Sequence, residues 1–434
     1  MNTVPRHSRA ATFALPILFI AASTCRVVAA DDVPTALRCG QIFDVVAGRA
    51  IGPATIVVSH GKIESIGVQV PVGAQVVDLG SMICLPGLID MHTHVVNTPG
   101  RSVSNDLDRS SAARALDGLH NAQVMLDTGF TTIRDVGAHD RYYSTVAIRD
   151  AIANGQATGP RMFVAPHMIG PTGSHADINN VANDLQIEIP RRIADGADEL
   201  RRTIREEVKF GADWIKLAVT GGVTSVGDNP LHSAYSDEEL RAAVDETHRL
   251  GRKITVHAIG GAGITAAVNA GVDCVEHGML IDDETIKTMK QRGICLVPTI
   301  YVLNYVIDRG AQMGISAASI AKAVALRDER DKHMRKVFAA GVKIAFGTDT
   351  IFPPQEAPRE FGELVKLGLS PAEAIRAATI NAAQILGISD QVGTLERGKI
   401  ADIVSVSVNP LDDIHTLEKV RFVMKSGRVI KFPL

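Results

Sequence analysis

Two histidines one residue apart end an apolar stretch of the chain, Leu85-Pro-Gly-Leu-Ile-Asp-Met-His-Thr-His94. In an extended strand, residues i and i+2 lie on the same face, so His92 and His94 point the same way. Two neutral imidazoles at the end of a strand suit a divalent metal such as zinc. Because a single His-x-His pattern is also common on protein surfaces, the other ligands have to come from elsewhere in the chain.

The middle of the chain, residues 87–388, alternates short apolar runs with helical stretches, which is typical of a parallel β/α array. Two of the helices have clear start signals, because Ser236 with Glu239 and Ser370 with Glu373 form capping boxes. Strands interleaved with helices in this way predict an α/β protein with a (β/α)8 TIM barrel. The predicted strands are residues 85–92, 130–136, 161–166, 213–219, 253–257, 272–276, 294–298 and 342–347.

The active site of such a barrel lies at the carboxyl ends of its strands, which gives an independent test of the metal hypothesis. The ends of five predicted strands carry four histidines, an aspartate and a lysine: His92, His94, Lys216, His257, His277 and Asp349. Convergence of these types at one end of the barrel predicts a metal site. A structural role for Lys216, as a strand lysine in an ion pair, stays open at this point.

The two ends of the chain lack a helical period. Residues 31–86 and 389–434 contain short strands and turns, with hairpins that turn at His60-Gly61 and at Ser426-Gly427. These two segments predict a small β-sandwich domain that is built from both termini.

The first thirty residues have the layout of a secretory signal. Arg6 and Arg9 precede an apolar run over residues 11–22, and Val28-Ala-Ala30 resembles a cleavage site. The run is too short to span a bilayer, so we expect residues 1–30 to be a signal peptide and the protein to be exported, in the periplasm, without a stable membrane span. A membrane anchor is the alternative.

The composition indicates a folded protein, with 46% hydrophobic and 21% charged residues among 434. A net charge of −3 argues against a nucleic-acid partner. Beyond residue 30 the cysteines fit no zinc-binding spacing, so the simplest interpretation is four buried apolar thiols, Cys39, Cys84, Cys274 and Cys295. A disulfide between Cys274 and Cys295 is the alternative, because these residues lie on consecutive predicted strands.

The motifs together resemble the metal-dependent amidohydrolase superfamily, in the branch of Xaa-Pro dipeptidases, carboxypeptidase-like enzymes and ochratoxin-hydrolysing amidases. The likeness covers nearly all of the chain after residue 30. It includes the segment ending at His94, the Lys216 strand, Thr172-Gly-Ser-His175, Gly347-Thr-Asp349, the helix from Ser370 and Gly393-Thr-Leu-Glu-Arg-Gly-Lys-Ile-Ala-Asp402.

The resemblance implies two divalent metal ions, with zinc as the expected metal, and a homo-oligomer. It implies that His92, His94 and Asp349 hold one metal, that His257 and His277 hold the other, and that an N6-carboxylated Lys216 bridges them. The expected mechanism uses a water between the metals, whose pKa they lower until it attacks as hydroxide. Asp349 would take its proton and deliver it to the leaving amine.

The expected substrate is a small-molecule amide, either a dipeptide or an N-acyl amino acid with a free carboxylate. A cyclic-amide hydrolase of the imidazolonepropionase or dihydroorotase type is the alternative enzyme, and a binding protein with an inactive site is the alternative of another class. Deaminases of the superfamily resemble one another in a glutamate shortly after the fifth-strand histidine. Here Ala258-Ile-Gly-Gly261 follows His257, so deamination is not expected.

Substrate contacts are harder to place. His175 matches a position that the resemblance puts near the substrate carbonyl or carboxylate, although Ser174 replaces the more usual glycine. His167, just past the third predicted strand, is a second candidate. The glycine-rich loop over residues 221–235 is long enough for a lid, and its His232 and Tyr235 are candidates for binding a carboxylate. Tyr301 is a candidate for an apolar subsite. Structural roles stay open for all of these.

Overall fold

The computed structural model describes residues 33–98, 109–138, 140, 142–179, 182, 184 and 192–432. The predicted signal peptide, residues 1–30, lies outside the described residues and stays a prediction. Among the described helices, none combines the length and the apolar character that crossing a bilayer requires.

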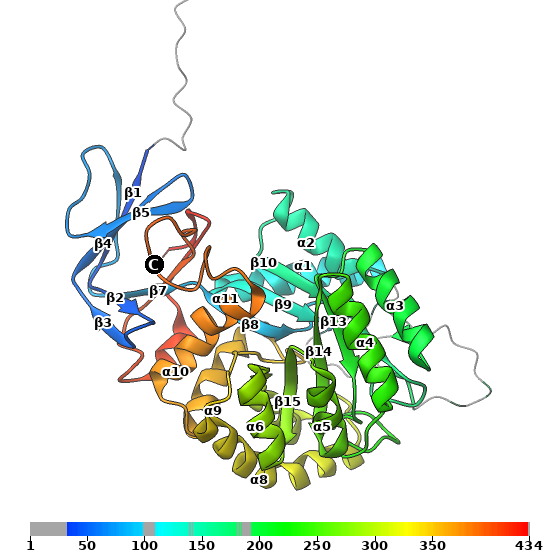
Figure 1. The fold of residues 1–434 in the computed structure, drawn as a ribbon. Helices are drawn as coiled ribbons and strands as arrows, with labels where there is room; N and C mark the ends of the chain where they lie inside the picture. The colour runs from blue at the N-terminus through cyan, green and yellow to red at the C-terminus, as the bar shows by residue number, and fades with distance from the viewer. Residues whose placement is uncertain are drawn as a thin grey trace, which may run out of the picture.

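Parallel strands form the centre of the larger part of the molecule (Figure 1). One sheet has the order β10-β9-β8 and the other has the order β12-β11-β13-β14-β15-β16. Their bounds are β8 (Leu88–Thr93), β9 (Phe130–Val136), β10 (Arg161–Ala165), β11 (Met168–Gly170), β12 (Arg192–Ile193), β13 (Trp214–Ala218), β14 (Lys253–Gly260), β15 (Cys274–Leu280) and β16 (Cys295–Val297).

Backbone hydrogen bonds connect the edges of these two sheets. The amide of Asp213, next to β13, donates to the Val164 carbonyl of β10. On the other side, residues 343–349 lie between β16 and β8, because Ala345 donates to Leu296 and Met91 donates to Phe346. With the helices outside, this is a TIM-barrel-like α/β fold.

The helices cover the outside of the parallel strands (Figure 1). The capping boxes predicted at Ser236 and Ser370 are both confirmed. The helix predicted after Ser370 contains a π-helical turn, so its two ends are assigned as separate helices. The helices are α1 (Ser111–Asp127), α2 (Ser144–Ala153), α3 (Ala197–Lys209), α4 (Asp237–Arg249), α5 (Gly261–Ala270), α6 (Asp283–Arg292), α7 (Ile300–Arg309), α8 (Ala317–Ala340), α9 (Glu360–Lys366), α10 (Pro371–Arg376) and α11 (Ala382–Leu386).

Strands from both ends of the chain lie side by side next to the barrel, the N-terminal ones blue and the C-terminal ones red in Figure 1. They form two sheets, β5-β4-β1-β6 and β19-β18-β17-β7-β2-β3, which share an apolar cluster that includes Leu37, Ile56 and Phe422. The predicted hairpin turns are confirmed, with φ of 50° at both His60 and Ser426. The strands are β1 (Thr35–Cys39), β2 (Gln41–Asp44), β3 (Arg49–Ile51), β4 (Ala54–Ser59), β5 (Lys62–Gly67), β6 (Gln75–Asp78), β7 (Ile83–Pro86), β17 (Ile403–Val406), β18 (Phe422–Lys425) and β19 (Arg428–Lys431).

Two of the predicted strands are wrong in detail. The strand expected at 85–92 is divided at Gly87 between β7 and β8, which belong to different sheets. Glycine is required there, because a Cβ would lie 2.1 Å from the Thr131 hydroxyl oxygen. The segment expected at 342–347 makes only an isolated bridge, from Ile344 to Leu296. Beyond this segment the chain bends at Asp349, whose φ is 54°.

The four cysteines of the described residues form two disulfides, Cys39–Cys84 and Cys274–Cys295, so the prediction of four free buried thiols is wrong. Cys274 and Cys295 are register partners on the adjacent strands β15 and β16, with Cα atoms 4.5 Å apart. Cys39 ends β1 and Cys84 lies in β7, so the other disulfide joins the two terminal sheets. Spacing along the chain does not reveal such register, which is why the sequence pattern favoured thiols.

Candidate metal centre

All the candidate ligands from the strand ends line one cavity of about 250 Å³. They come from β8 and the residue after it, from β13, β14 and β15, and from the turn after residues 343–347. The structure therefore brings together the full predicted set: His92, His94, Lys216, His257, His277 and Asp349.

Two imidazoles and one carboxylate converge most closely. The Nε2 atoms of His92 and His94 are 3.3 Å apart, and Asp349 Oδ1 lies 3.6 Å from the first and 3.1 Å from the second. One ligand atom from each of these residues falls within 4.8 Å of the others. Two imidazole nitrogens and a carboxylate oxygen at such separations can hold one divalent cation.

The other ring nitrogens of these two histidines face acceptors. His92 Nδ1 lies 2.7 Å from Glu276 Oε2, and His94 Nδ1 lies 2.6 Å from the carbonyl oxygen of Gly137. An N–H at Nδ1 leaves the lone pair on Nε2, which is the nitrogen that faces Asp349. This arrangement of a metal-binding histidine with an outer acceptor is common in metal sites, because it fixes the tautomer and the ring plane.

A second pair of rings lies beside the first. The centroids of His257 and His277 are 4.6 Å apart, and those of His92 and His277 are 5.0 Å apart. His277 Nδ1 is 2.7 Å from the Thr299 hydroxyl, while His257 Nε2 faces the Gly221 carbonyl at 3.4 Å. The remaining nitrogens, Nε2 of His277 and Nδ1 of His257, are thus the ones suited to a second cation.

Lys216 is 1% exposed on β13, and its Nζ has no hydrogen-bond partner among the described residues. Burial lowers its pKa to about 8. A buried ammonium without an acceptor is costly, whereas a neutral amine carries the lone pair that can attack carbon dioxide. The unpaired nitrogen amid ligand side chains therefore fits the expected carboxylation, which would convert it into a bridging anion.

The electrostatics of the rings favour metal binding. Burial lowers the pKa of His92 and of His257 well below the usual value, and lowers that of His277 to about 4, so these rings are neutral near neutral pH. Burial opposes charge on His94 too, but its hydrogen bond to Asp349 and the negative charges of Asp349 and Asp135 together outweigh this and raise its pKa. Burial alone would raise the pKa of Asp349, yet His92 and His94 hold it below its usual range.

Three non-glycine residues at or beside the candidate ligands have a strained backbone. His277, Thr299 and Asp349 have φ values of 68°, 47° and 54°, in the left-handed region that non-glycine residues rarely adopt. Each such residue costs on the order of 1–3 kcal/mol, which the surrounding structure must offset. Strain at three residues around one cavity, where Thr299 is the hydrogen-bond partner of His277, is typical of a functional site.

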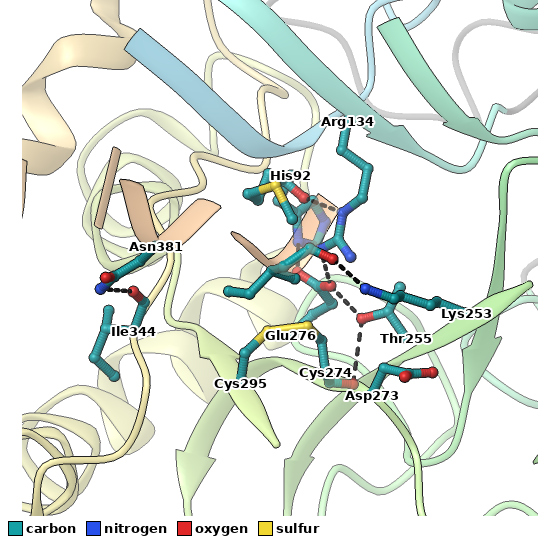
Figure 2. Close-up of a disulfide and its surroundings, with 12 residues drawn as sticks. His92, Arg134, Lys253, Thr255, Asp273, Cys274, Glu276, Cys295, Ile344 and Asn381 are labelled. Carbon is teal, nitrogen blue, oxygen red and sulfur yellow. Dashed lines mark hydrogen bonds and ion pairs between the residues drawn. A yellow bond between two sulfur atoms is a disulfide. The ribbon is translucent and has the colours of Figure 1, made fainter. Parts of the chain in front are cut away.

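The buried ion pair of Arg134 and Glu276 contacts the outer ring nitrogen of His92. Glu276 accepts hydrogen bonds from Arg134 and Thr255 as well as facing His92, and both Arg134 and Glu276 are fully buried. Figure 2 shows this group next to the Cys274–Cys295 disulfide. The sequence interpretation did not single out Arg134 or Glu276, although an arginine inside the apolar strand Phe-Thr-Thr-Ile-Arg-Asp-Val was a signal of a buried partner.

The proposed substrate contacts fare differently. His175 lines the cavity and stacks on His257, with centroids 4.2 Å apart. His167 is wrong as a pocket residue: it is 2% exposed, lies outside the cavity lining and pairs with Glu207 at 3.0 Å. His167 follows β10 and faces α3, where Glu207 is the hydrogen-bond partner that a buried imidazole needs.

Two of the loop residues are also wrong as pocket residues. Tyr235 is buried against the core, with its hydroxyl 3.4 Å from the Ala194 carbonyl. His232 is exposed and faces Asn229, outside the cavity lining. Tyr301 likewise does not line the cavity, because its hydroxyl is tied to Glu356 at 2.6 Å and to Arg359 at 3.0 Å.

An apolar wall that the sequence interpretation missed makes up much of the cavity. It comes from β14, β15 and α7, from the segment between α7 and α8, and from the turn after Asp349, namely Ile259, Met279, Val302, Leu303, Val306, Met313, Ile315 and Ile351. Such residues carry no distinctive motif, since aliphatic side chains at helical spacing also describe an ordinary core.

A model of the amidohydrolase family matches residues 83–430, which include every candidate ligand. The chain belongs to the amidohydrolase family. This amidohydrolase is 33% identical to the ochratoxinase of Aspergillus niger over 376 residues, which cover 81% of this chain and 76% of that protein. It is 25% identical to an imidazolonepropionase of Kosmotoga olearia over 413 residues, 86% of this chain and 90% of that one.

Among solved structures, the amidohydrolase is similar to a Xaa-Pro dipeptidase with methionine bound in its active site. The two share 32% identity with a TM-score of 0.86, over 92% of this chain and 100% of the other. The likeness therefore spans both the barrel and the strands of the termini, in agreement with the branch that the motifs indicate.

Proposed function

We propose that this chain is a binuclear metal hydrolase that cleaves the amide bond of a dipeptide or an N-acyl amino acid. One observation carries the proposal: four histidines, an aspartate and a buried lysine without a hydrogen-bond partner among the described residues line one cavity. The donor set fits two divalent cations, with His92, His94 and Asp349 on one side and His257 and His277 on the other. A carboxylated Lys216 would join them.

The chemistry divides between the bound metals and the side chains. When bound, a pair of divalent ions supplies a nucleophilic water near neutral pH and polarises the scissile carbonyl. Asp349, whose carboxylate faces both His92 and His94, is placed to accept a proton as the water attacks and to return it to the departing amine. His175 is placed to contact the polar end of the substrate, since it lines the same cavity.

The cavity supports a substrate with one apolar part. Its aliphatic wall suits an apolar side chain or acyl group, and apart from Lys216 its lining, among the described residues, includes neither lysine nor arginine. A substrate carboxylate would therefore be bound by His175 and the amides of Asn97 and Asn179, which also line the cavity. The resemblance to an ochratoxinase and to a Xaa-Pro dipeptidase supports small-molecule amide substrates.

The test is hydrolysis of a small panel, with and without chelator: ochratoxin A, the dipeptide Met-Pro, N-acetyl-L-phenylalanine and imidazolonepropionate. We expect chelator-sensitive cleavage of one or more of the first three, restored by added zinc. Asp349→Asn should retain much of the metal and lose most of the turnover, whereas Asp237→Asn, at an exposed position on α4, should behave as wild type. Full activity of Asp349→Asn would refute the role given to that carboxylate.

A cyclic-amide hydrolase is the second candidate, supported by the likeness to an imidazolonepropionase over 86% of the chain. Activity confined to imidazolonepropionate would favour it. Lys216, buried and without a hydrogen-bond partner in the part of the chain that the structure describes, argues for the first candidate, because imidazolonepropionases resemble this chain without needing a bridging lysine.

We also infer that residues 1–30 are a signal peptide and that the mature protein is exported to the periplasm. The two disulfides support this location, because disulfides persist in oxidising compartments and are rare in the cytosol. N-terminal sequencing of the protein from a periplasmic extract tests the inference, with a mature start near Asp31 as the expected result.

A further inference from the structure

The imidazole of His175 lies in a tight slot beside the candidate metal ligands. It stacks on the ring of His257 with an interplanar angle of 25°. The backbone of Gly222 approaches it so closely that a Cβ there would lie 2.1 Å from His175 Nδ1 and 2.3 Å from its Cε1. Because φ of Gly222 does not lie in the left-handed region, the glycine is required by the ring and not by the backbone conformation. The ring therefore has little room to rotate.

A chain of hydrogen bonds fixes one edge of this ring. His175 Nδ1 lies 2.8 Å from the Ser225 hydroxyl, and that hydroxyl lies 2.5 Å from Asp228 Oδ2. A carboxylate only accepts, so the Ser225 proton points to Asp228. The Ser225 oxygen must then accept from His175, which places a proton on Nδ1. The relay thus selects one tautomer of His175.

Helix α8 holds the other end of the relay. Lys322 Nζ donates to the carbonyls of Gly222 at 2.9 Å and Ser225 at 3.1 Å, and lies 3.5 Å from Asp228 Oδ1. The Ser319 hydroxyl adds a bond to the Thr224 carbonyl. Residues 221–228 are therefore tied to α8, and this part of the glycine-rich loop forms a wall of the cavity.

We propose that Ser225, Asp228 and Lys322 are positioning residues that hold His175 as its Nδ1–H tautomer, so that Nε2 is the nitrogen with which it meets the substrate. The proposal deepens the proposed function and rests on it in one respect, the contact between His175 and an amide substrate. The relay itself is independent of which amide is cleaved.

In the kinetic test, Ser225 is replaced, and kcat and KM of the variant are each compared with those of the wild type. Ser225→Ala removes the acceptor of Nδ1–H, and we expect kcat/KM for ochratoxin A and Met-Pro to fall roughly 5–30-fold, the usual range for one lost hydrogen bond to a positioned group. Ser225→Thr keeps the hydroxyl and should restore most of the activity. Ser233→Ala removes a hydroxyl from the same loop that donates to the Tyr235 carbonyl, and it should be silent.

A double-mutant cycle separates positioning from general damage to the loop. The loss of kcat/KM should divide between kcat and KM in the same ratio in His175→Ala as in Ser225→Ala. The total loss should be larger in His175→Ala. In the His175→Ala background, Ser225→Ala should have no further effect, because the group that it positions is gone. Additive losses in the double variant would overturn the proposal.

A second measurement needs no substrate and so separates the relay from the proposed function. Nitrogen NMR of the metal-loaded enzyme, isotope-labelled at histidine and assigned with His175→Ala, should show His175 protonated at Nδ1 in the wild type and altered in Ser225→Ala. A wild-type ring with its proton only at Nε2 would refute the relay even if the enzyme is active. Failure to cleave any amide, with the Nδ1–H signal present, would instead refute the proposed function and leave the relay established.

Discussion

Glu276 is the residue whose replacement tests the support of the metal centre most directly. The change Glu276→Gln keeps the shape of the side chain and removes its charge. Glu276 accepts from His92 Nδ1 at 2.7 Å and from the Arg134 guanidinium, and all of these side chains are fully buried. Two separate losses follow, one of metal affinity and one of stability, because Glu276 both orients the candidate ligand His92 and neutralises the cation of Arg134.

The two losses have different magnitudes. Removing one partner of a buried ion pair leaves the other charge uncompensated, which typically costs about 3–5 kcal/mol of unfolding free energy. Weakening the outer hydrogen bond of a metal-binding histidine typically costs about 10–100-fold in metal affinity, or roughly 1.4–2.7 kcal/mol. Glu276→Gln should show both, in urea unfolding of the metal-free protein and in zinc competition against a chelator.

The double variant Arg134→Met/Glu276→Gln separates them. It removes the cation together with its partner, and an unbranched apolar side chain suits the space beside the Trp214 ring, 4.5 Å from the guanidinium carbon. We expect it to regain most of the stability and none of the metal affinity. Wild-type zinc affinity in Glu276→Gln, or affinity restored in the double variant, would show that Glu276 does not act through His92.

Four further predictions test the rest of the structure. Dialysis against a chelator should lower the free energy of unfolding, and zinc at 100 times its Kd should return about 2.7 kcal/mol, measured by urea titration. Replacing Cys274 and Cys295 by alanine should cost about 3 kcal/mol, because the disulfide closes a loop with a sequence separation of 21. Gly222→Ala should cost about 1–3 kcal/mol by overpacking, but nothing in a His175→Ala background. Hydrogen bonds from Arg249 and Arg205 lower the pKa of Glu246 to about 2, so its contribution is present above pH 4.5 and is lost as the pH falls toward 2. Since both arginines are more than half exposed, Glu246→Gln should cost only about 1 kcal/mol at pH 7 and almost nothing near pH 2.

The metal ligands were predictable because each lies in or directly after a short apolar segment of the chain. His257 follows Ile-Thr-Val in β14 and His277 follows Cys-Val-Glu in β15, and a barrel brings such segments to one face whatever its loops do. The substrate residues were not predictable in the same way. His167 and Tyr235 also follow strands or loops near that face, but the direction of each side chain depends on Glu207 and Ala194, which lie on other elements.

The supporting groups were hidden for a related reason. Glu276 precedes His277 in the chain and would point to the opposite face of an ideal strand. The left-handed conformation of His277, with φ of 68°, breaks that alternation, so both side chains serve the same site. The alternation of side chains between the two faces therefore describes β15 up to Glu276 and fails at His277, whose backbone is not extended.

The charges of the centre explain why the unpaired lysine matters. Glu276 is neutralised by Arg134, and the four histidines are ligands only when neutral, so Asp349 is the only carboxylate among the six candidate ligands. Two divalent cations facing one carboxylate would leave a large positive charge in a site whose side chains are mostly buried. Carboxylation of Lys216 changes a side chain that is neutral at best into an anion in the middle of the group.

We therefore expect metal loading to depend on carbon dioxide, so that bicarbonate-depleted apoprotein takes up zinc less tightly than apoprotein supplied with bicarbonate. Lys216→Ala should lose that dependence, whereas Lys253→Ala, a change to a half-buried strand lysine outside the cavity lining, should keep it.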